Sequence, residues 1–385
     1  MMSLRRVAAL AIKEVREITR DRLLFTLAFL LPPLMMVVIG FGVNTDVREI
    51  PIVVLDFDRT HSSRELAYKF RDSQYFDFVG YVEQERQIQR LITDNQARAA
   101  IVIPPKFHEQ LRSGQPASVQ TIIDGSIPPR AETVGGYVAS VIASFSHRQV
   151  TDQLARTRGI TPSAASALAN PISLETRFLY NEAMTSRWAI GPGCIMTVLA
   201  FIPPILASVG VVREKESGSI DNVYSSTLTR PEFVLGKLIP YVLISSISFF
   251  VLFATTLLVF QVPFRGSPIA FSVTGILYVT CTTMMGIIIS FFVRSQIAAV
   301  ILAVLITLIP TLQYSGMIVP LSSLSDAGQI QARMLPASYF YEAIQASFLK
   351  GTGFAGLQQP IAALLVYSLV LYALCCLKFS KRPKS

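Results

Sequence analysis

The sequence predicts an α-helical polytopic membrane protein with six transmembrane helices and an inserted extracytoplasmic α/β domain. Only 15% of its 385 residues are Asp, Glu, Lys or Arg, against roughly 25% in an ordinary soluble domain. Hydrophobic residues make up 51% of the chain. Six apolar segments free of these charged residues are each long enough to cross a hydrocarbon core of about 30 Å. One long stretch of soluble composition separates the first segment from the second.

Residues 1–22 are expected to form an amphipathic helix on the cytoplasmic membrane surface. Apolar residues recur there at helical spacing, and polar residues, among them Lys13, Glu14, Arg20 and Asp21, lie largely between and beyond them. A basic flank that only fixes topology accounts for the same residues. The apolar stretch that follows is longer than the 7–15 residues typical of a signal peptide, and no cleavage site of the usual small residues follows it. The first segment is therefore expected to remain as a span.

The predicted spans and their connections divide the rest of the chain. A cytoplasmic loop is expected at residues 213–237, an outer re-entrant segment at 320–358, and a cytoplasmic tail at 378–385. Residues 320–358 are too polar for a span, but they carry paired aromatic side chains. The spans are predicted at residues 23–43, 189–212, 238–261, 268–293, 296–319 and 359–377.

The basic residues orient these spans. Lys and Arg gather beside the span ends that face the N-terminal side, whereas the short outer loops hold only Arg265, Arg333 and Lys350. By the positive-inside rule both termini are cytoplasmic, and the protein is expected in the bacterial inner membrane. The net charge of +9 is thus explained by basic residues at the cytoplasmic ends of the spans. These residues form no basic patch on a water-soluble face, so nucleic acid is not an expected partner.

Residues 44–188 have the composition and rhythm of a soluble α/β domain. Short strands are predicted at 50–55, 76–81, 99–103 and 119–123, with helices at 62–71, 83–93 and 104–113 between them. A longer helix is expected at 131–158, followed by a linker and an extended segment at 174–180.

The chain lacks the residues that enzymes of common classes need. It contains no phosphate-binding glycine loop with Lys and Ser or Thr, so it is not expected to bind a nucleotide itself. His61, His108 and His147 are scattered through the outer domain, and no serine-hydrolase elbow occurs. All four cysteines fall inside predicted spans and lack zinc-site spacing. No catalytic, cofactor-binding or metal-binding residue is therefore predicted.

Charge-free spans also bear on the energy source. Ion-coupled transporters usually place ionisable residues within the membrane, and none occurs in these spans. Sodium sites made of backbone carbonyls and hydroxyls remain an alternative. If the protein moves a solute uphill, we expect the energy to come from a partner at the cytoplasmic face. Residues 213–237 form the one cytoplasmic loop long enough for that contact.

This loop carries a resemblance to a known family. Its residues 213–216 read Arg-Glu-Lys-Glu, Gly218-Ser219 and Asp221 follow, and Glu232-Phe233 precedes Gly236-Lys237. The pattern resembles the coupling loop of type-2 ABC transporter permeases with the type V exporter fold, in the drug-exporter-like branch with a large extracytoplasmic domain. Ser219 and Asp221 replace the family's usual Thr and Glu, and a proline stands at Pro231 rather than at Thr227.

The resemblance implies partners and residue roles. Two permease protomers, as a homodimer or a heterodimer with a paralogue, would assemble with separate ATP-binding subunits that hold ATP and Mg. The implied ATPase-coupling residues are Arg213, Glu214, Glu216, Gly218, Ser219, Asp221 and Glu232. The implied interface-helix residues are Lys13, Glu14, Arg20 and Asp21. Prolines within spans are candidate hinges, namely Pro32, Pro33, Pro203, Pro204 and Pro310.

The expected function is export of an amphipathic or hydrophobic compound, drug-like or lipid-like, because a charge-free passage disfavours bare ions and sugar chains. By analogy with drug exporters, the outer domain is expected to dock a periplasmic adaptor that joins an outer-membrane channel. Two alternatives stay open. One is an ATP-driven sodium extruder, which sodium-stimulated ATP hydrolysis would identify. The other is a membrane receptor or assembly factor without transport.

Overall fold

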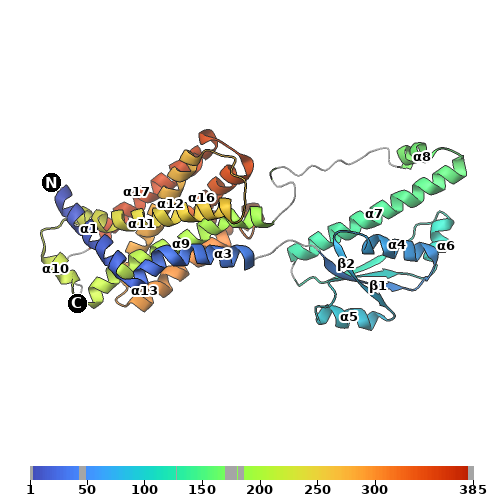
Figure 1. The fold of residues 1–385 in the computed structure, drawn as a ribbon, viewed down its shortest axis with the longest axis horizontal. Helices are drawn as coiled ribbons and strands as arrows, with labels where there is room; N and C mark the ends of the chain where they lie inside the picture. Colours follow the sequence, from blue (N-terminus) through green and yellow to red (C-terminus); the bar gives the residue numbers. More distant parts are fainter. Residues whose placement is uncertain (1–2, 43–48, 127, 170–179, 181–185, 380–385) are drawn as a thin grey trace. The chain divides into compact units, whose positions relative to one another are not determined.

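A computed structural model describes residues 3–42, 49–126, 128–169, 180 and 186–379. The chain forms two compact units, one of residues 1–44 with 178–385 and one of residues 45–177. The predicted extended segment at 174–180 lies outside the described residues except for Tyr180. Figure 1 shows the helical unit and the α/β unit.

The described part of the helical unit contains six helices long and apolar enough to cross a membrane, as predicted. The first begins at Arg22 and ends at Gly42, with a π-helical stretch in its first half. The elements of the unit, in chain order, are α1 (Leu4–Arg20), α2 (Arg22–Phe25), η1 (Thr26–Leu30), α3 (Leu31–Gly42), α9 (Ser186–Glu216), α10 (Ile220–Ser225), α11 (Arg230–Leu258), α12 (Pro268–Phe292), α13 (Gln296–Ala303), η2 (Val304–Leu308), α14 (Ile309–Tyr314), η3 (Leu321–Ser323), α15 (Asp326–Arg333), α16 (Pro336–Ile344), η4 (Gln345–Lys350), η5 (Phe354–Leu357) and α17 (Gln358–Lys378).

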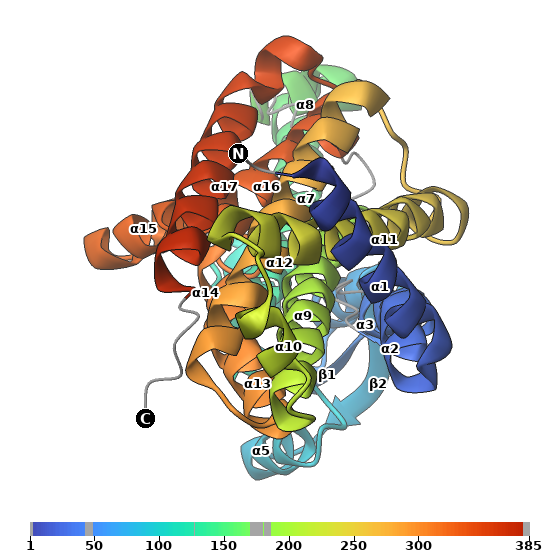
Figure 2. The same cartoon turned by 90° about the vertical axis from the view of Figure 1, so that its left-hand side faces the viewer.

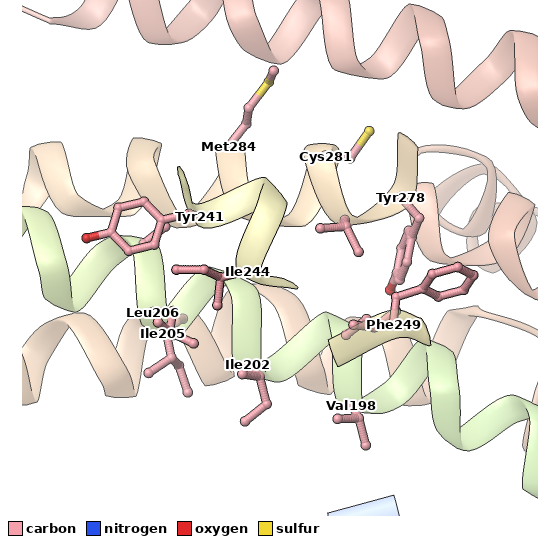
Figure 3. Packing of buried hydrophobic residues seen from close by; sticks show 14 of the residues in the cluster. Val198, Ile202, Ile205, Leu206, Tyr241, Ile244, Phe249, Tyr278, Cys281 and Met284 are labelled. Carbon is pink, nitrogen blue, oxygen red and sulfur yellow. The ribbon is translucent and has the colours of Figure 1, made fainter. Parts of the chain in front are cut away.

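Helix α9 forms the centre of the bundle. Within its most apolar window 94% of the residues are buried, against 28% in the first span and 22% in the fifth and sixth. Its side chains Val198, Ile202 and Leu206 pack with Tyr241 of α11 and Tyr278 of α12 (Figure 3). The outer helices instead have apolar faces that no other described residues cover, which suits contact with lipid or with another membrane protein.

Residues 320–358 pack against the spans through α16. The ring of Phe340 stacks on Tyr278 of α12, with centroids 4.4 Å apart, and Phe340 is fully buried. The segment is thus part of the helical unit's core. Its predicted re-entry into the membrane stays a prediction.

All five predicted hinge prolines lie within continuous helix, and for two of them a neighbouring helix binds the carbonyl group that the proline frees. A proline cannot donate to the carbonyl four residues before it. Pro204 frees Ala200, whose carbonyl accepts a hydrogen bond from Thr307 Oγ1 of η2 at 2.6 Å. Pro32 frees Ala28, whose carbonyl accepts from Ser248 Oγ of α11, also at 2.6 Å. Such side-chain bonds make proline tolerable in a span, and hinge motion at these prolines stays a prediction.

Replacing Thr307 by valine is therefore expected to destabilise the bundle by about 1–3 kcal/mol, because the Ala200 carbonyl would stay buried without a partner. The matched control is Thr280→Val, since the Thr280 hydroxyl bonds only the carbonyl of Ile276 in its own helix. Unfolding midpoints of the purified variants in detergent measure the difference. Equal midpoints for the two variants would contradict this role of Thr307.

Several helix ends differ from the predicted span ends, chiefly at the charged loop, and the membrane bounds themselves stay predictions. The second span is predicted to end at Val212 and the loop to run to Lys237. In the structure α9 continues to Glu216 and α11 begins at Arg230, after a capping box between Thr229 and Glu232. The charged residues in this stretch belong to these helices and connect them to neighbouring helices. The fifth apolar helix ends at Tyr314, before the predicted span end at 319, and a 3₁₀ turn from Phe354 leads into the sixth.

The α/β unit confirms the predicted alternation of strands and helices. Its sheet has the order β2-β1-β3-β4, with β1 parallel to β2 and β3, and β4 antiparallel to β3. Phe70 of α4 and Val134 of α7 cover one face of the sheet, and Ile88 of α5 covers the other. The elements are β1 (Ile50–Asp56), α4 (His61–Arg71), β2 (Phe76–Val82), α5 (Glu85–Thr93), β3 (Ala99–Ile103), α6 (Phe107–Arg112), β4 (Gln120–Ile123), α7 (Pro128–Arg158) and α8 (Pro162–Ala169).

Candidate functional site: a charged junction of three helices

Helix α1, the end of α9 and the start of α11 meet at one end of the helical unit. Figure 2 looks onto this end, where α1 lies beside α11 and α10 follows α9. The end of α17 is nearby, because Phe379 stacks on Phe233 of α11 with centroids 4.1 Å apart. Both ends of the described chain therefore lie at the same end of the bundle, as an even number of spans requires.

A buried lysine joins the three helices. Lys237 Nζ lies 2.6 Å from Glu14 Oε1 of α1 and 2.5 Å from Glu214 Oε2 of α9, and its side chain is 0% exposed. Tyr241, one turn further along α11, donates its hydroxyl to Glu14 Oε2 at 2.9 Å. Lys13 pairs with the other oxygen of Glu214 from the water-exposed side. In this buried junction of Glu14, Glu214, Lys237 and Tyr241, every side-chain oxygen and nitrogen has at least one hydrogen-bond partner.

The junction balances its charges. Burial raises the pKa of the Glu14 carboxyl, while the neighbouring Lys237 opposes that rise. The carboxylate oxygens of Glu14, Glu17 and Glu214 lie within 4.8 Å of one another, close enough to share a cation. Lys237 and Lys13 already serve that purpose, so we do not interpret the cluster as a metal site. The two carboxylates and the ammonium of Lys237 stabilise one arrangement of the helices, because removing Lys237 would leave two buried carboxylates without their shared counter-ion.

Close packing accompanies these ion pairs. Gly236 of α11 lies against Leu10 of α1, and a Cβ on Gly236 would fall 2.6 Å from Leu10 Cδ2. A side chain at position 236 would therefore push α1 away from α11. The glycine explains how Lys237, the next residue, comes within reach of Glu14.

Further contacts fasten both ends of α1. Near its start, the Ser3 amide donates to Glu232 Oε1 at 2.6 Å, and Glu232 also caps α11 through the Thr229 amide at 2.7 Å. At its other end, Asp21 accepts hydrogen bonds from the Leu24 and Leu23 amides and pairs with Arg213 of α9. These interactions, with the Leu24 amide the largest, lower the pKa of the Asp21 carboxyl. Helix α1 is thus held against the bundle along its whole length.

The last turn of α9 also joins the fourth and fifth spans. Lys215 Nζ donates to the Ser290 carbonyl of α12 at 2.5 Å. Glu216 accepts from the Gln296 amide at the start of α13 at 2.8 Å. A cation at a helix C-terminus and an anion at a helix N-terminus are both electrostatically favourable. A displacement of the end of α9 would therefore reach α1, α11, α12 and α13 together.

The structure brings together some of the predicted residues and separates others. Glu14 and Glu214 are buried in the junction and are not presented on a surface. Arg213 pairs with Asp21, and Glu216 bonds to α13. Gly218 has a φ of +72°, the left-handed conformation that glycine favours, and it ends the connection from α9. Ser219 bonds Ser217 Oγ at 2.9 Å.

Asp221 is exposed on α10, and Arg213, Glu216 and Gly218 are exposed before it. Arg20 is likewise exposed on α1. Lys237 and Tyr241 had no predicted role, although Lys237 belonged to the motif. The sequence did contain a signal for the role of Lys237. Glu14 and Glu214 lie next to predicted spans, where a carboxylate needs a counter-charge, and Lys237 lies at the start of another span.

A cleft of about 520 Å³ opens between α1 and the end of α9. Ala9 and Ile12 form part of its wall, and Lys13, Arg16 and Arg20 contribute cations. Glu214 and Ser219 line it from the α9 side. The cleft leads from the exposed face of α1 to the buried junction.

Comparison with known proteins identifies the family. The model of the ABC-2 family transporter proteins matches residues 23–377. The chain is 29% identical over 386 residues to the probable multidrug ABC transporter permease YbhS of Escherichia coli, covering 99% of this chain and 98% of that protein. It is 24% identical to the probable multidrug ABC transporter permease YbhR, covering 88% of each, and 23% identical to the inner membrane transport permease YhhJ, covering 99% and 98%.

These matches span almost the whole chain, including both the helical unit and the inserted α/β unit. They agree with the six apolar helices and with the resemblance seen in the residues around Gly218. Permeases of this kind are transport components, and their family implies a separate ATP-binding subunit as partner. The chain is a multi-pass membrane protein that belongs to the ABC-2 family of transporter permeases.

Proposed function

We propose that this chain is the membrane-embedded subunit of an ATP-driven exporter, which moves an amphipathic or hydrophobic compound out of the cytoplasm or the inner leaflet. The observation that carries the proposal is the buried junction, which joins the end of α9 to α1 and α11 beside α10, whose Asp221 is exposed. A partner that pushes on α10 would move an element rigidly connected to four other helices. The ATP-binding subunit, holding ATP and Mg, supplies that push.

The site residues divide into two groups under this proposal. Asp221 and the turn at Gly218 receive the ATP-binding subunit. Arg213, Glu214, Glu216 and Glu232, with Lys13, Glu14 and Asp21 of α1, carry the displacement into the spans. Ion pairs suit this transfer because they hold helix ends at fixed distances, so movement of one end moves its partners.

The charge distribution supports the orientation within this proposal. Both termini and α10 face the cytoplasm of a bacterial inner membrane, and residues 45–177 lie in the periplasm. Two permease protomers, identical or paralogous, bury part of the apolar faces that α3, α13 and α17 leave uncovered. The periplasmic unit docks an adaptor that leads to an outer-membrane channel. The relatives named as multidrug permeases support a drug-like cargo.

The cargo class rests on the chemistry of the spans. The six predicted spans contain no Asp, Glu, Lys or Arg, and the charged side chains described above gather at the helix ends. An apolar passage accepts compounds with large hydrophobic surfaces, whereas a bare ion would lose its hydration without compensation. The test is ATP-dependent uptake of fluorescent amphipathic dyes by inside-out vesicles that contain the permease and its co-purified ATP-binding subunit. Uptake without nucleotide, or ATP hydrolysis stimulated only by sodium, would contradict the proposal.

Replacing Gly218 by alanine is expected to lower ATP-driven uptake by about tenfold. The left-handed backbone costs a non-glycine residue about 1–2 kcal/mol, and a change of about 1.4 kcal/mol corresponds to a factor of ten in an equilibrium. The population of the turn conformation that positions α10 would therefore fall by about tenfold, and uptake would fall with it.

The matched control is Gly159→Ala. Gly159 has a φ of +62° and no atom within 4 Å of an added Cβ, so its backbone strain is similar, but it lies in the other unit. We expect this control to keep its uptake. If both variants lost uptake equally, or neither did, the Gly218 turn would have no specific role in coupling.

A further inference from the structure

Helix α1 has three distinct faces, and the junction uses only one of them. The first face is buried against the bundle and consists of Val7, Leu10, Glu14 and Ile18. A helix that only covered the bundle would be polar over the rest of its surface. The remaining two-thirds of α1 instead divides into an apolar stripe and a basic stripe.

The apolar stripe is exposed. Leu4 is 75% exposed, Ile12 53% and Val15 37%, and Ala8 lies on the same side at helical spacing. Within the described residues no other part of the chain covers these side chains. Helix α1 ends at Arg20, directly before the first membrane span. Its apolar stripe is therefore expected at the depth where the headgroup region of the bilayer meets the acyl chains.

The basic stripe borders the apolar one. Arg5, Arg16 and Arg20 are exposed, and none of them forms an ion pair with a residue that the structure describes. Lys13 and Arg213 differ, because they pair with Glu214 and Asp21. Arg16 and Arg20 are one helical turn apart and line the cleft of about 520 Å³, whose wall also includes Ile12. The three carboxylates in this wall are paired with Lys13 or Arg213, namely those of Glu17, Asp21 and Glu214. Unpaired cations next to apolar side chains match the chemistry of an anionic phospholipid, with its phosphate joined to acyl chains.

We infer that the exposed surface of α1 binds the headgroups of anionic phospholipids, with Arg16 and Arg20 holding the phosphate in the cleft and Ile12 and Val15 lying against the acyl chains. The membrane is favoured over an acidic protein surface because the apolar stripe borders the cations along the whole helix. A protein groove at the coupling turn would need only the charges. This inference goes beyond the proposed transport and does not depend on it.

The test measures lipid binding and requires no transport. The full-length protein, purified in detergent, is mixed with phosphatidylglycerol or phosphatidylcholine, and bound lipid is counted by native mass spectrometry. We expect phosphatidylglycerol to bind more tightly, and the preference to weaken with salt because the interaction is electrostatic. The variant Arg16→Gln/Arg20→Gln is expected to bind phosphatidylglycerol about tenfold to thirtyfold more weakly, the loss of two charges near an anionic surface.

The matched control is Arg86→Gln/Arg90→Gln on α5. These two arginines are exposed, have the same spacing along a helix and lie in the other unit; we expect their loss to leave lipid binding unchanged. Equal retention of the two lipids by the wild type would overturn the inference. So would an Arg16→Gln/Arg20→Gln variant that keeps its phosphatidylglycerol and instead loses its ATP-binding subunit, since the arginines would then belong to a protein interface.

Discussion

Replacing Lys237 by methionine is expected to destabilise the helical unit by about 3–5 kcal/mol. The substitution keeps the length and much of the apolar stem of the side chain, but it leaves the carboxylates of Glu14 and Glu214 buried without their shared counter-ion. Removing one partner of a buried ion pair typically costs this amount. The unfolding midpoint of the purified protein in detergent, followed by near-ultraviolet circular dichroism, measures the effect.

The loss of stability caused by Lys237→Met should depend on pH. Burial already raises the pKa of Glu14 while Lys237 opposes that rise, so removing Lys237 raises it further. A carboxyl with a raised pKa in the folded state destabilises that state once the pH exceeds the unfolded pKa, and the penalty grows until the folded pKa is passed. The difference between the variant and the wild type should therefore be smaller at about pH 5 than at about pH 8.

Two further variants separate buried charge from lost packing. Lys350 is exposed and forms no ion pair among the described residues, so Lys350→Met should leave the midpoint unchanged. The triple variant Glu14→Gln/Glu214→Gln/Lys237→Met removes all three charges of the junction, and we expect it to recover much of the stability. A single Lys237→Met variant as stable as the wild type across this pH range would show that the buried junction does not hold the three helices together.

Replacing Gly286 by leucine is expected to separate α12 from α9. A Cβ at position 286 would lie 2.3 Å from the carbonyl oxygen of Pro204 and 2.6 Å from its Cα, and backbone atoms cannot move aside as the end of a side chain can. Overpacking of this kind costs about 1–3 kcal/mol or more. The centre of the bundle would open where α9 contains its paired prolines, so we expect both a lower unfolding midpoint and loss of ATP-driven uptake.

The matched control is Gly42→Leu at the end of the first span, where nothing lies within 4 Å of an added Cβ. It adds the same apolar side chain to a span and should leave the midpoint close to that of the wild type. A Gly286→Leu variant with the midpoint and uptake of the control would contradict the close approach of α12 and α9.

Much of the architecture can be predicted from the sequence because it depends on local and compositional signals. A run of apolar residues long enough to cross a bilayer predicts a span wherever it occurs. Alternating strand and helix patterns in residues 44–188 likewise predict a small α/β domain. The bend at Gly218 is local too, since a left-handed turn favours glycine.

The charged junction could not be predicted in the same way. The second span is predicted to end at Val212, before Glu214 and Lys215. The partners of these two residues, however, come from α1, α11 and α12, which are separate helices along the chain. The local sequence around a charged residue at a span end is the same whether water solvates the charge or a residue of another helix pairs with it. The prolines illustrate the same limit, because Thr307 and Ser248 satisfy the freed carbonyls from other spans.

The most direct test of the account asks what touches α10. A photo-crosslinking amino acid is placed at Asp221, and at Asp326 of α15 as an exposed control expected on the other side of the membrane. Both variants are illuminated in native membranes with and without ATP. The account predicts a cross-link from position 221 to an ATP-binding subunit, changed in yield by ATP, and none from position 326. A position 221 that is labelled from outside intact cells, or that captures no ATP-binding subunit, would contradict it.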